Sequence, residues 1–194
     1  MEKKKYFASI SKWNADRVVS ISAIIVSLGT LFMIFYQTNL IRKEQKASVM
    51  PSLRIGYSIS QDSIGVKENL FVINQGLGPA FIDEVRIVEN GNSYDLDPYS
   101  YISRVPGYQK EETTYFNRLY TGSIISQNDR VKIFEKITDT TSRVALSRLF
   151  KFPYEVGSRE VSERATSVIE IVYKNIYDDK WLIRSNEAVP QIVD

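Results

Sequence analysis

Histidine and cysteine are both absent from the 194 residues of this chain. Without histidine there is no Ser-His-Asp triad and no histidine general base. Without cysteine there is no thiol chemistry, and ordinary zinc sites lose both of their usual ligands. The remaining acidic pairs, Asp83-Glu84, Glu111-Glu112 and Asp178-Asp179, lie at expected strand ends or turns, where solvated charge is ordinary. We therefore predict a protein that is not an enzyme and that uses no metal or other cofactor.

Charge is also absent from one long stretch, residues 18–36, which reads VVSISAIIVSLGTLFMIFY. As a helix these residues would extend about 28 Å, close to the hydrocarbon thickness of a bilayer. A buried core helix in so small a domain would normally carry a polar face. A cleaved signal peptide would have a shorter apolar run and a small-residue cleavage site. We therefore predict one retained transmembrane helix at 18–36.

The two parts of the chain on either side of Pro51 differ in charge. Residues 1–51 carry eight basic and three acidic side chains, a net charge of +5, and the whole chain has a net charge of +2. The basic flank 1–17 and the juxtamembrane helix or linker 37–51 suit anionic lipid headgroups. The β domain predicted for 52–194 has no basic excess, which argues against nucleic-acid binding. Basic residues are almost equally numerous on both sides of the span, so the positive-inside rule leaves the orientation open.

After Pro51, which disfavours continuation of the helix, the pattern becomes extended. We predict strands at 52–60, 69–74, 80–89, 93–96, 123–125, 130–137, 167–173 and 180–184, with one short helix at 142–152. Short strands separated by turns are typical of a β-sandwich, Ig-like in type, or of a small barrel. The turn Gly76-Leu77-Gly78 leads into a strand, so it is not a phosphate loop. We expect it to be a turn or bulge whose glycines permit a positive φ.

Residues 97–120 fit no helical or strand period, and we interpret them as an insertion in the β domain. They interleave tyrosines with basic residues, a composition that is common in binding surfaces. We predict that Arg104, Tyr108 and Arg118 bind a ligand or partner. The alternative is that the aromatic rings cover one open end of the β core.

Small side chains recur along the predicted span at spacings of three and four residues. These residues, Ser20, Ala23, Ser27 and Thr30, share one helix face. Small residues permit close helix packing in lipid, so we predict that the helix forms a homo-oligomer. The alternative is that the hydroxyl groups bond back to carbonyls of their own helix.

Three segments carry a family resemblance: YQTNLIRKEQKASVMPSL, LFVINQGLGPAFIDEV and YKNIYDDKW. They resemble a group of bacterial membrane proteins that have one N-terminal helix and a β domain marked by an N-x-G-x-GPA turn. The resemblance implies a bacterial origin and a place in the inner (cell) membrane. It implies no activity and carries over no functional residue.

Together these features predict a single-pass, membrane-anchored module that binds or senses a ligand without catalysis. Its partners would be the lipid bilayer, further copies of itself, and a protein or small-molecule ligand that the residues do not specify. The alternative function is a membrane effector of bacterial phage defence, in which the β domain senses a signal and the helices oligomerise. That alternative depends on architectural analogy alone.

Overall fold

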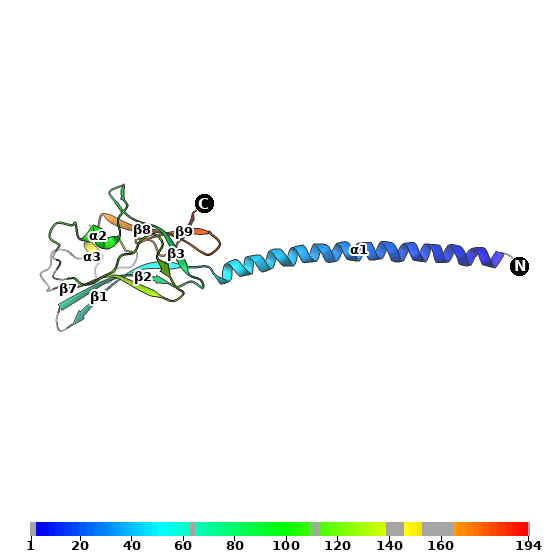
Figure 1. Ribbon diagram of the computed structural model, residues 1–194, viewed down its shortest axis with the longest axis horizontal. Coiled ribbons are helices and arrows are strands. Elements are labelled where there is room, and N and C mark those ends of the chain that lie inside the picture. The colour runs from blue at the N-terminus through cyan, green and yellow to red at the C-terminus, as the bar shows by residue number, and fades with distance from the viewer. Residues whose placement is uncertain are drawn as a thin grey trace. The chain divides into compact units, whose positions relative to one another are not determined.

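The computed structural model describes residues 3–62, 65–108, 110, 113–138, 146–152 and 165–193 (Figure 1). The chain forms two compact units, Met1–Lys46 and Ala47–Asp194. The first unit consists of the N-terminal helix and the second is the β domain, and each is considered by itself.

The helix α1 runs from Lys3 to Ser48, a length of 46 residues. Its large apolar side chains from Val18 to Ile41 are exposed, and none of its most apolar stretch is buried in the protein. Among the described residues, this one helix is long and apolar enough to cross a membrane. It contains the predicted span and continues through the predicted juxtamembrane segment, because no proline interrupts the backbone before Pro51.

The β domain contains two antiparallel sheets. The first has the order β1-β2-β7-β5 and consists of β1 (Leu53–Asp62), β2 (Gly65–Asn74), β7 (Arg130–Thr138) and β5 (Thr113–Phe116). The second has the order β10-β9-β8-β3-β4, with β6 paired to the start of β3. Its strands are β10 (Gln191–Val193), β9 (Lys180–Arg184), β8 (Ser167–Lys174), β3 (Ala80–Glu89), β4 (Asn92–Tyr94) and β6 (Ile124–Ile125). The described residues of the domain also include two short helices, α2 (Pro98–Ile102) and α3 (Leu146–Leu149).

Both sheets contribute side chains to one hydrophobic core. Along β2, every second residue from Glu68 to Asn74 is buried, which matches the two-residue period of a strand with one face on a core. Leu70 from the first sheet and Ile171 from the second are both fully buried in the same cluster. In β1 the alternating residues Leu53 and Ile55 are likewise buried.

The long strands lie where the sequence predicts them, except that β2 begins at Gly65 and not at residue 69, whereas three short elements do not follow from any period. These elements are α2, β5 and β10. Residues 97–120 thus contain a helix and a strand, although their sequence fits no helical or strand period. Asp97 caps α2 by accepting a hydrogen bond from the backbone N–H of Ser100 at 3.1 Å. Of the predicted helix 142–152, residues 142–145 lie outside the described residues, and the observed helix is only Leu146–Leu149.

Aromatic rings of this same segment pack on the core. Tyr99 is only 9% exposed and stacks on Phe116 with 4.2 Å between ring centroids. Tyr101 and Tyr108 are partly buried against the core. These contacts are what the alternative interpretation of 97–120 predicts, and they make part of the segment structural.

Candidate functional site

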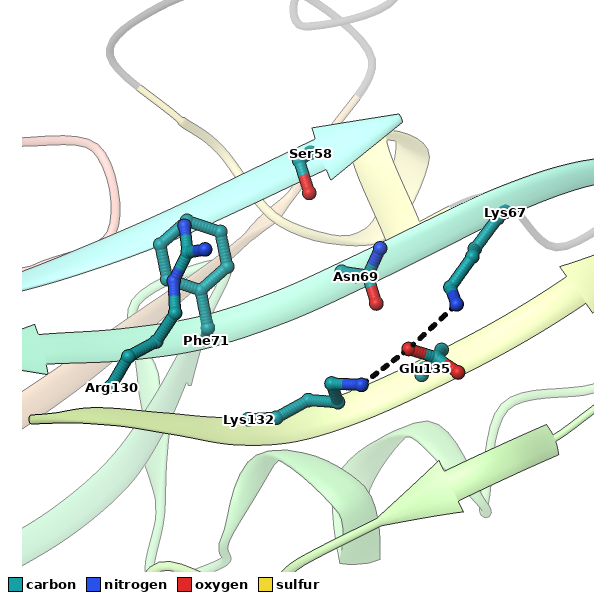
Figure 2. A pocket seen from close by; sticks show the side chains of 7 residues that line it. All are labelled: Ser58, Lys67, Asn69, Phe71, Arg130, Lys132 and Glu135. Atoms are coloured by element: carbon teal, nitrogen blue, oxygen red, sulfur yellow. Dashed lines mark hydrogen bonds and ion pairs between the residues drawn. The ribbon is translucent and has the colours of Figure 1, made fainter. Parts of the chain in front are cut away.

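The outer face of the first sheet carries a polar cavity of about 250 Å³. Strand alternation directs Lys67, Asn69 and Phe71 of β2 to the face opposite the buried Leu70 and Val72. We call this feature the sheet-face cavity, and Figure 2 shows its lining residues, Ser58, Lys67, Asn69, Phe71, Arg130, Lys132 and Glu135. They come from three strands that are neighbours in the sheet, of which β1 and β2 are consecutive in the sequence and β7 is distant from both.

A bulge in β7 brings two of the charged residues to this face. Phe71 of β2 lies opposite Lys132, while the preceding Leu70 lies opposite Phe134, so Ile133 is the extra residue. Ile133 and Phe134 are both buried. In a regular strand Lys132 and Glu135 would point to opposite faces, because their numbers differ by three. The bulge puts both on the outer face.

Phe71 and Arg130 form a close pair at one end of the cavity. The guanidinium carbon of Arg130 lies 3.6 Å from the centroid of the Phe71 ring, which is cation–π geometry. Gly56 is the cross-strand partner of Phe71. A Cβ atom at Gly56 would overlap the Phe71 ring, so this glycine makes room for the ring to lie against the sheet.

Glu135 is the centre of the ionic contacts in the cavity. Its Oε2 atom lies 2.6 Å from Nζ of Lys132 and 3.2 Å from Nζ of Lys67, and the two lysines approach it from different strands (Figure 2). The hydroxyl of Thr114 donates a further hydrogen bond to Oε1 at 3.0 Å. Hydrogen bonding from Lys132 lowers the pKa of the Glu135 carboxyl, and the bonds from Thr114 and Lys67 add to that effect against the opposing effect of burial. The carboxylate therefore remains ionised at neutral pH.

The residues proposed from the sequence as a ligand site lie apart from one another. Arg104 lines a cavity of about 310 Å³ together with Glu89 and Tyr101. Arg118 lines a different cavity, of about 250 Å³, next to Tyr120. The hydroxyl of Tyr108 shares a hydrogen bond with that of Thr113 at 2.8 Å. The structure does not bring the three side chains together into one site.

The hydroxyl groups of the predicted association face bond within α1. Ser20 donates to the carbonyl of Asp16, and Ser27 donates to that of Ala23, each at 2.8 Å. Thr30 donates to the carbonyl of Val26 at 2.9 Å. This is the arrangement that the alternative interpretation predicts, in which the hydroxyl groups bond to carbonyls of their own helix. Self-association of the helix stays a prediction, and it would depend on the small size of these residues.

The N-x-G-x-GPA turn holds the segment that follows α1. Asn74 is fully buried, and its Oδ1 accepts hydrogen bonds from the backbone N–H groups of Ser52 at 3.1 Å and Gly76 at 3.0 Å. Its Nδ2 donates to the carbonyls of Gly78 at 2.7 Å and Ile125 at 3.0 Å. One side chain thus joins the start of β1, the turn and β6.

The glycines of this turn are needed for space and not for a positive φ. Neither Gly76 nor Gly78 is among the residues with positive φ, so the expectation from sequence was wrong on this point. A Cβ at Gly76 would overlap the backbone of Met50–Ser52, and one at Gly78 would overlap the backbone of Val49. The turn therefore packs directly on the chain that leads into β1.

A buried polar cluster on the inner face of the first sheet was not found by sequence reasoning. Tyr57 donates a hydrogen bond to Glu68 at 2.6 Å, and the backbone N–H of Leu146 donates to the same carboxyl at 3.2 Å. Nζ of Lys136 lies 4.0 Å from Glu68, and both side chains are only 5% exposed. Burial, then the charge of Glu68, raises the pKa of Tyr57 well above its ordinary value. Glu68 thus connects α3 with β1 and β7.

No family model, curated protein or solved structure with which the chain was compared matches it. The candidate site is therefore argued from its own geometry. Sequence reasoning missed the sheet-face cavity, although alternation at Lys67, Asn69 and Phe71 indicates a polar outer face on β2. The missing information was that β7 lies beside β2 and contains a bulge.

Proposed function

We propose that this chain is a single-pass protein of the bacterial cell membrane whose β domain binds a ligand without catalysis. In this proposal the two sheets form a β-sandwich, and the sheet-face cavity is the ligand-binding surface. The observation that carries the proposal is the bulge in β7, which gathers Lys132 and Glu135 beside Lys67 and Arg130 in one cavity.

The residues of the cavity are suited to binding and poorly suited to proton transfer. The sequence contains no histidine or cysteine, which removes the most common acid–base and nucleophilic groups. Glu135 is the one carboxylate that lines the cavity, and its charge is already shared between two lysines. A carboxylate with a lowered pKa is a weak general base.

The anchor supports a role at a membrane surface. A helix of this length and composition supplies the membrane attachment, and the β domain follows after a short segment that ends in Pro51. A binding domain tethered in this way meets ligands at, or close to, the bilayer. The large shared core of the two sheets supports the sandwich arrangement.

A ligand screen on the full chain tests the proposal. The chain, purified in uncharged detergent micelles, is heated with a panel of metabolites and the melting temperature is recorded. A ligand that binds only the folded state raises the melting temperature by mass action. We expect at least one compound to raise it for the wild-type chain but not for Lys132→Gln. Failure of every compound, or chemical conversion of any bound compound, would contradict the proposal.

A further inference from the structure

We infer that the sheet-face cavity takes a phosphate group, carried by a soluble molecule or by a lipid headgroup. The inference deepens the proposed function and rests on it. It has three independent supports, which are the charge of the cavity, the arrangement of its donors and its size.

The first support is charge. Lys67, Arg130 and Lys132 line the cavity with one carboxylate, Glu135, so the lining residues carry a net charge of +2. A phosphomonoester carries about −1.5 to −2 at neutral pH, so the two charges match closely. A carboxylate or a chloride ion would leave at least one positive charge unbalanced.

The second support is the arrangement of donors. The cation–π contact with Phe71 positions the guanidinium group of Arg130 over the ring, and no described residue accepts a hydrogen bond from this guanidinium, so its N–H donors are available. Among the described residues, no carboxylate forms an ion pair with this guanidinium group. An arginine edge is the donor group that best matches the oxygens of phosphate.

The lysines complete the donor set. Each lysine ammonium group has three N–H donors, and its contact with Glu135 uses one of them. Asn69 lies between Lys67 and Phe71 in Figure 2, and Ser58 lines the same cavity from β1. An anion would therefore meet charged donors together with a neutral amide and a hydroxyl group.

Glu135 has the role of ordering the lysines. It neutralises one of three positive charges and holds the Lys67 and Lys132 side chains, which come from different strands, over the same face. Long lysine side chains lose considerable rotamer freedom when a ligand orders them. Because Glu135 already restricts both, less of that cost falls on phosphate binding.

The third support is size. The cavity volume, about 250 Å³, is below the range of roughly 300–1,000 Å³ that is typical of pockets enclosing a drug-sized ligand. Phe71 has Gly56 against its ring and Arg130 over it, so the ring is not open for stacking with a nucleobase. The cavity thus suits a phosphate group, while the rest of the ligand would remain outside.

Calorimetric titration of the full chain in uncharged detergent micelles tests the inference. One arm uses inorganic phosphate, and the other uses dihexanoyl phosphatidic acid with dihexanoyl phosphatidylcholine as the lipid reference. Chloride keeps the ionic strength constant. The variants are Arg130→Gln and Lys132→Gln, with Lys174→Gln as the charge-matched control, because Lys174 is outside the cavity and pairs with the exposed Asp178.

We expect phosphate binding to weaken about tenfold or more in each cavity variant, as for a lost charge-assisted contact. The Lys174→Gln variant should bind as the wild type does. Arg130→Lys should also bind less tightly, because lysine keeps the charge but lacks the planar fork. Unchanged melting temperatures would show that the variants are folded.

The two arms distinguish the source of the phosphate group. Tighter binding of dihexanoyl phosphatidic acid than of inorganic phosphate, lost in Arg130→Gln, would identify a lipid headgroup. Equal binding would identify a phosphate on a soluble molecule. If neither probe binds, or if all three glutamine variants lose binding equally, the inference is overturned. The proposed function survives that failure only if some other compound still raises the melting temperature of the wild type but not of Lys132→Gln.

Discussion

At the scale of single residues, Asn74 shows how one amide organises the membrane-proximal sequence of the β domain. Four backbone groups from three segments bond to its side chain, which uses both acceptor positions of its oxygen and both donor hydrogens of its nitrogen. No other side chain of similar size offers two donors and two acceptors in one plane. The first residue of the N-x-G-x-GPA turn is therefore specified by hydrogen bonding.

Replacement of Asn74 tests this account. Asn74→Ala leaves buried backbone donors and acceptors without partners, each at a cost of about 1–3 kcal/mol. We expect the free energy of unfolding to fall by at least about 3 kcal/mol in urea titrations of the full chain in micelles. Asn92→Ala, at an exposed position of β4, is the control and should change it little. A small loss for Asn74→Ala would show that water replaces the side chain.

Glu170 is a second residue whose contacts affect stability, in this case its dependence on pH. Burial raises its pKa, but hydrogen bonds from Arg184 at 2.6 Å and Arg86 at 2.7 Å outweigh burial, so the pKa is lowered from 4.5. A lowered folded-state pKa contributes stability at neutral pH that disappears as the pH falls below 4.5. Glu135 acts in the same direction.

We expect Glu170→Gln to flatten the dependence of unfolding free energy on pH in the acid range. The measurement is urea unfolding of both proteins at several pH values from neutral to about 3. Glu44→Gln, in the exposed part of α1, is the control. Parallel pH curves for wild type and Glu170→Gln would contradict the assignment of the ion pairs.

At the scale of elements, the sequence pattern identified the long strands because burial demands apolar residues, at every second position in most of β2 and at nearly every position in β8. It did not identify β5 or β10, because no residue of either strand is buried. Without a buried face, a strand does not need alternating apolar residues. The α2 helix had a local signal in Asp97-Pro98, an N-cap followed by proline. That signal was missed because the helix is only five residues long.

The candidate site was less predictable than the fold, for a physical reason. It depends on the pairing of β2 with β7, which are joined through β3, β4, β5 and β6 along the chain. Ile133 and Phe134 are adjacent apolar residues, a pattern that does not distinguish a bulge from an ordinary buried strand. Arg104, Tyr108 and Arg118 were selected by composition, which contains no information on the direction of a side chain.

Gly78 permits a test of the turn as an element. A Cβ at this position would overlap the backbone of Val49, which has no rotamer with which to move away. We expect Gly78→Ala to destabilise the β domain by about 2 kcal/mol, within the usual cost of overpacking. Leu77→Ala is the matched control, because Leu77 is 60% exposed in the same turn. Equal effects of the two substitutions would mean that the segment before β1 is easily displaced.

Helix association also has a test at this scale. Because the Ser27 hydroxyl bonds to the Ala23 carbonyl, any packing of α1 with a second copy depends on small size. We expect Ala23→Leu to weaken a membrane two-hybrid signal, while Ser27→Ala and Ile25→Leu leave it unchanged. Loss of the signal in Ser27→Ala would show that the hydroxyl bonds across helices. Equal signals in all variants would contradict association of α1 through its small residues.

At the scale of the whole molecule, the boundary between the two units falls before the start of β1. The second unit begins at Ala47, and residues 49–52 contact the Gly76–Gly78 turn through backbone bonds such as Leu77 N–H to the Met50 carbonyl at 2.9 Å. The segment before β1 therefore belongs structurally to the β domain, although residues 37–51 were predicted to be a juxtamembrane helix or linker. A fragment that starts at β1 would lose these contacts.

Fractionation and unfolding together test this organisation. Expressed in bacteria, the full chain should remain in the membrane fraction after an alkaline wash, because residues 18–36 carry no charge and the most apolar stretch of α1 is not buried in the protein. Fragment 47–194 should be recovered in the supernatant.

Fragment 53–194 should be less stable than fragment 47–194, since the Asn74 oxygen loses the Ser52 donor and the carbonyl of Met50 no longer accepts from Leu77. Each lost buried bond costs about 1 kcal/mol or more, so the difference should exceed about 2 kcal/mol in urea. Equal stabilities would place the domain boundary at Leu53, and release of the full chain by the wash would rule out the membrane span.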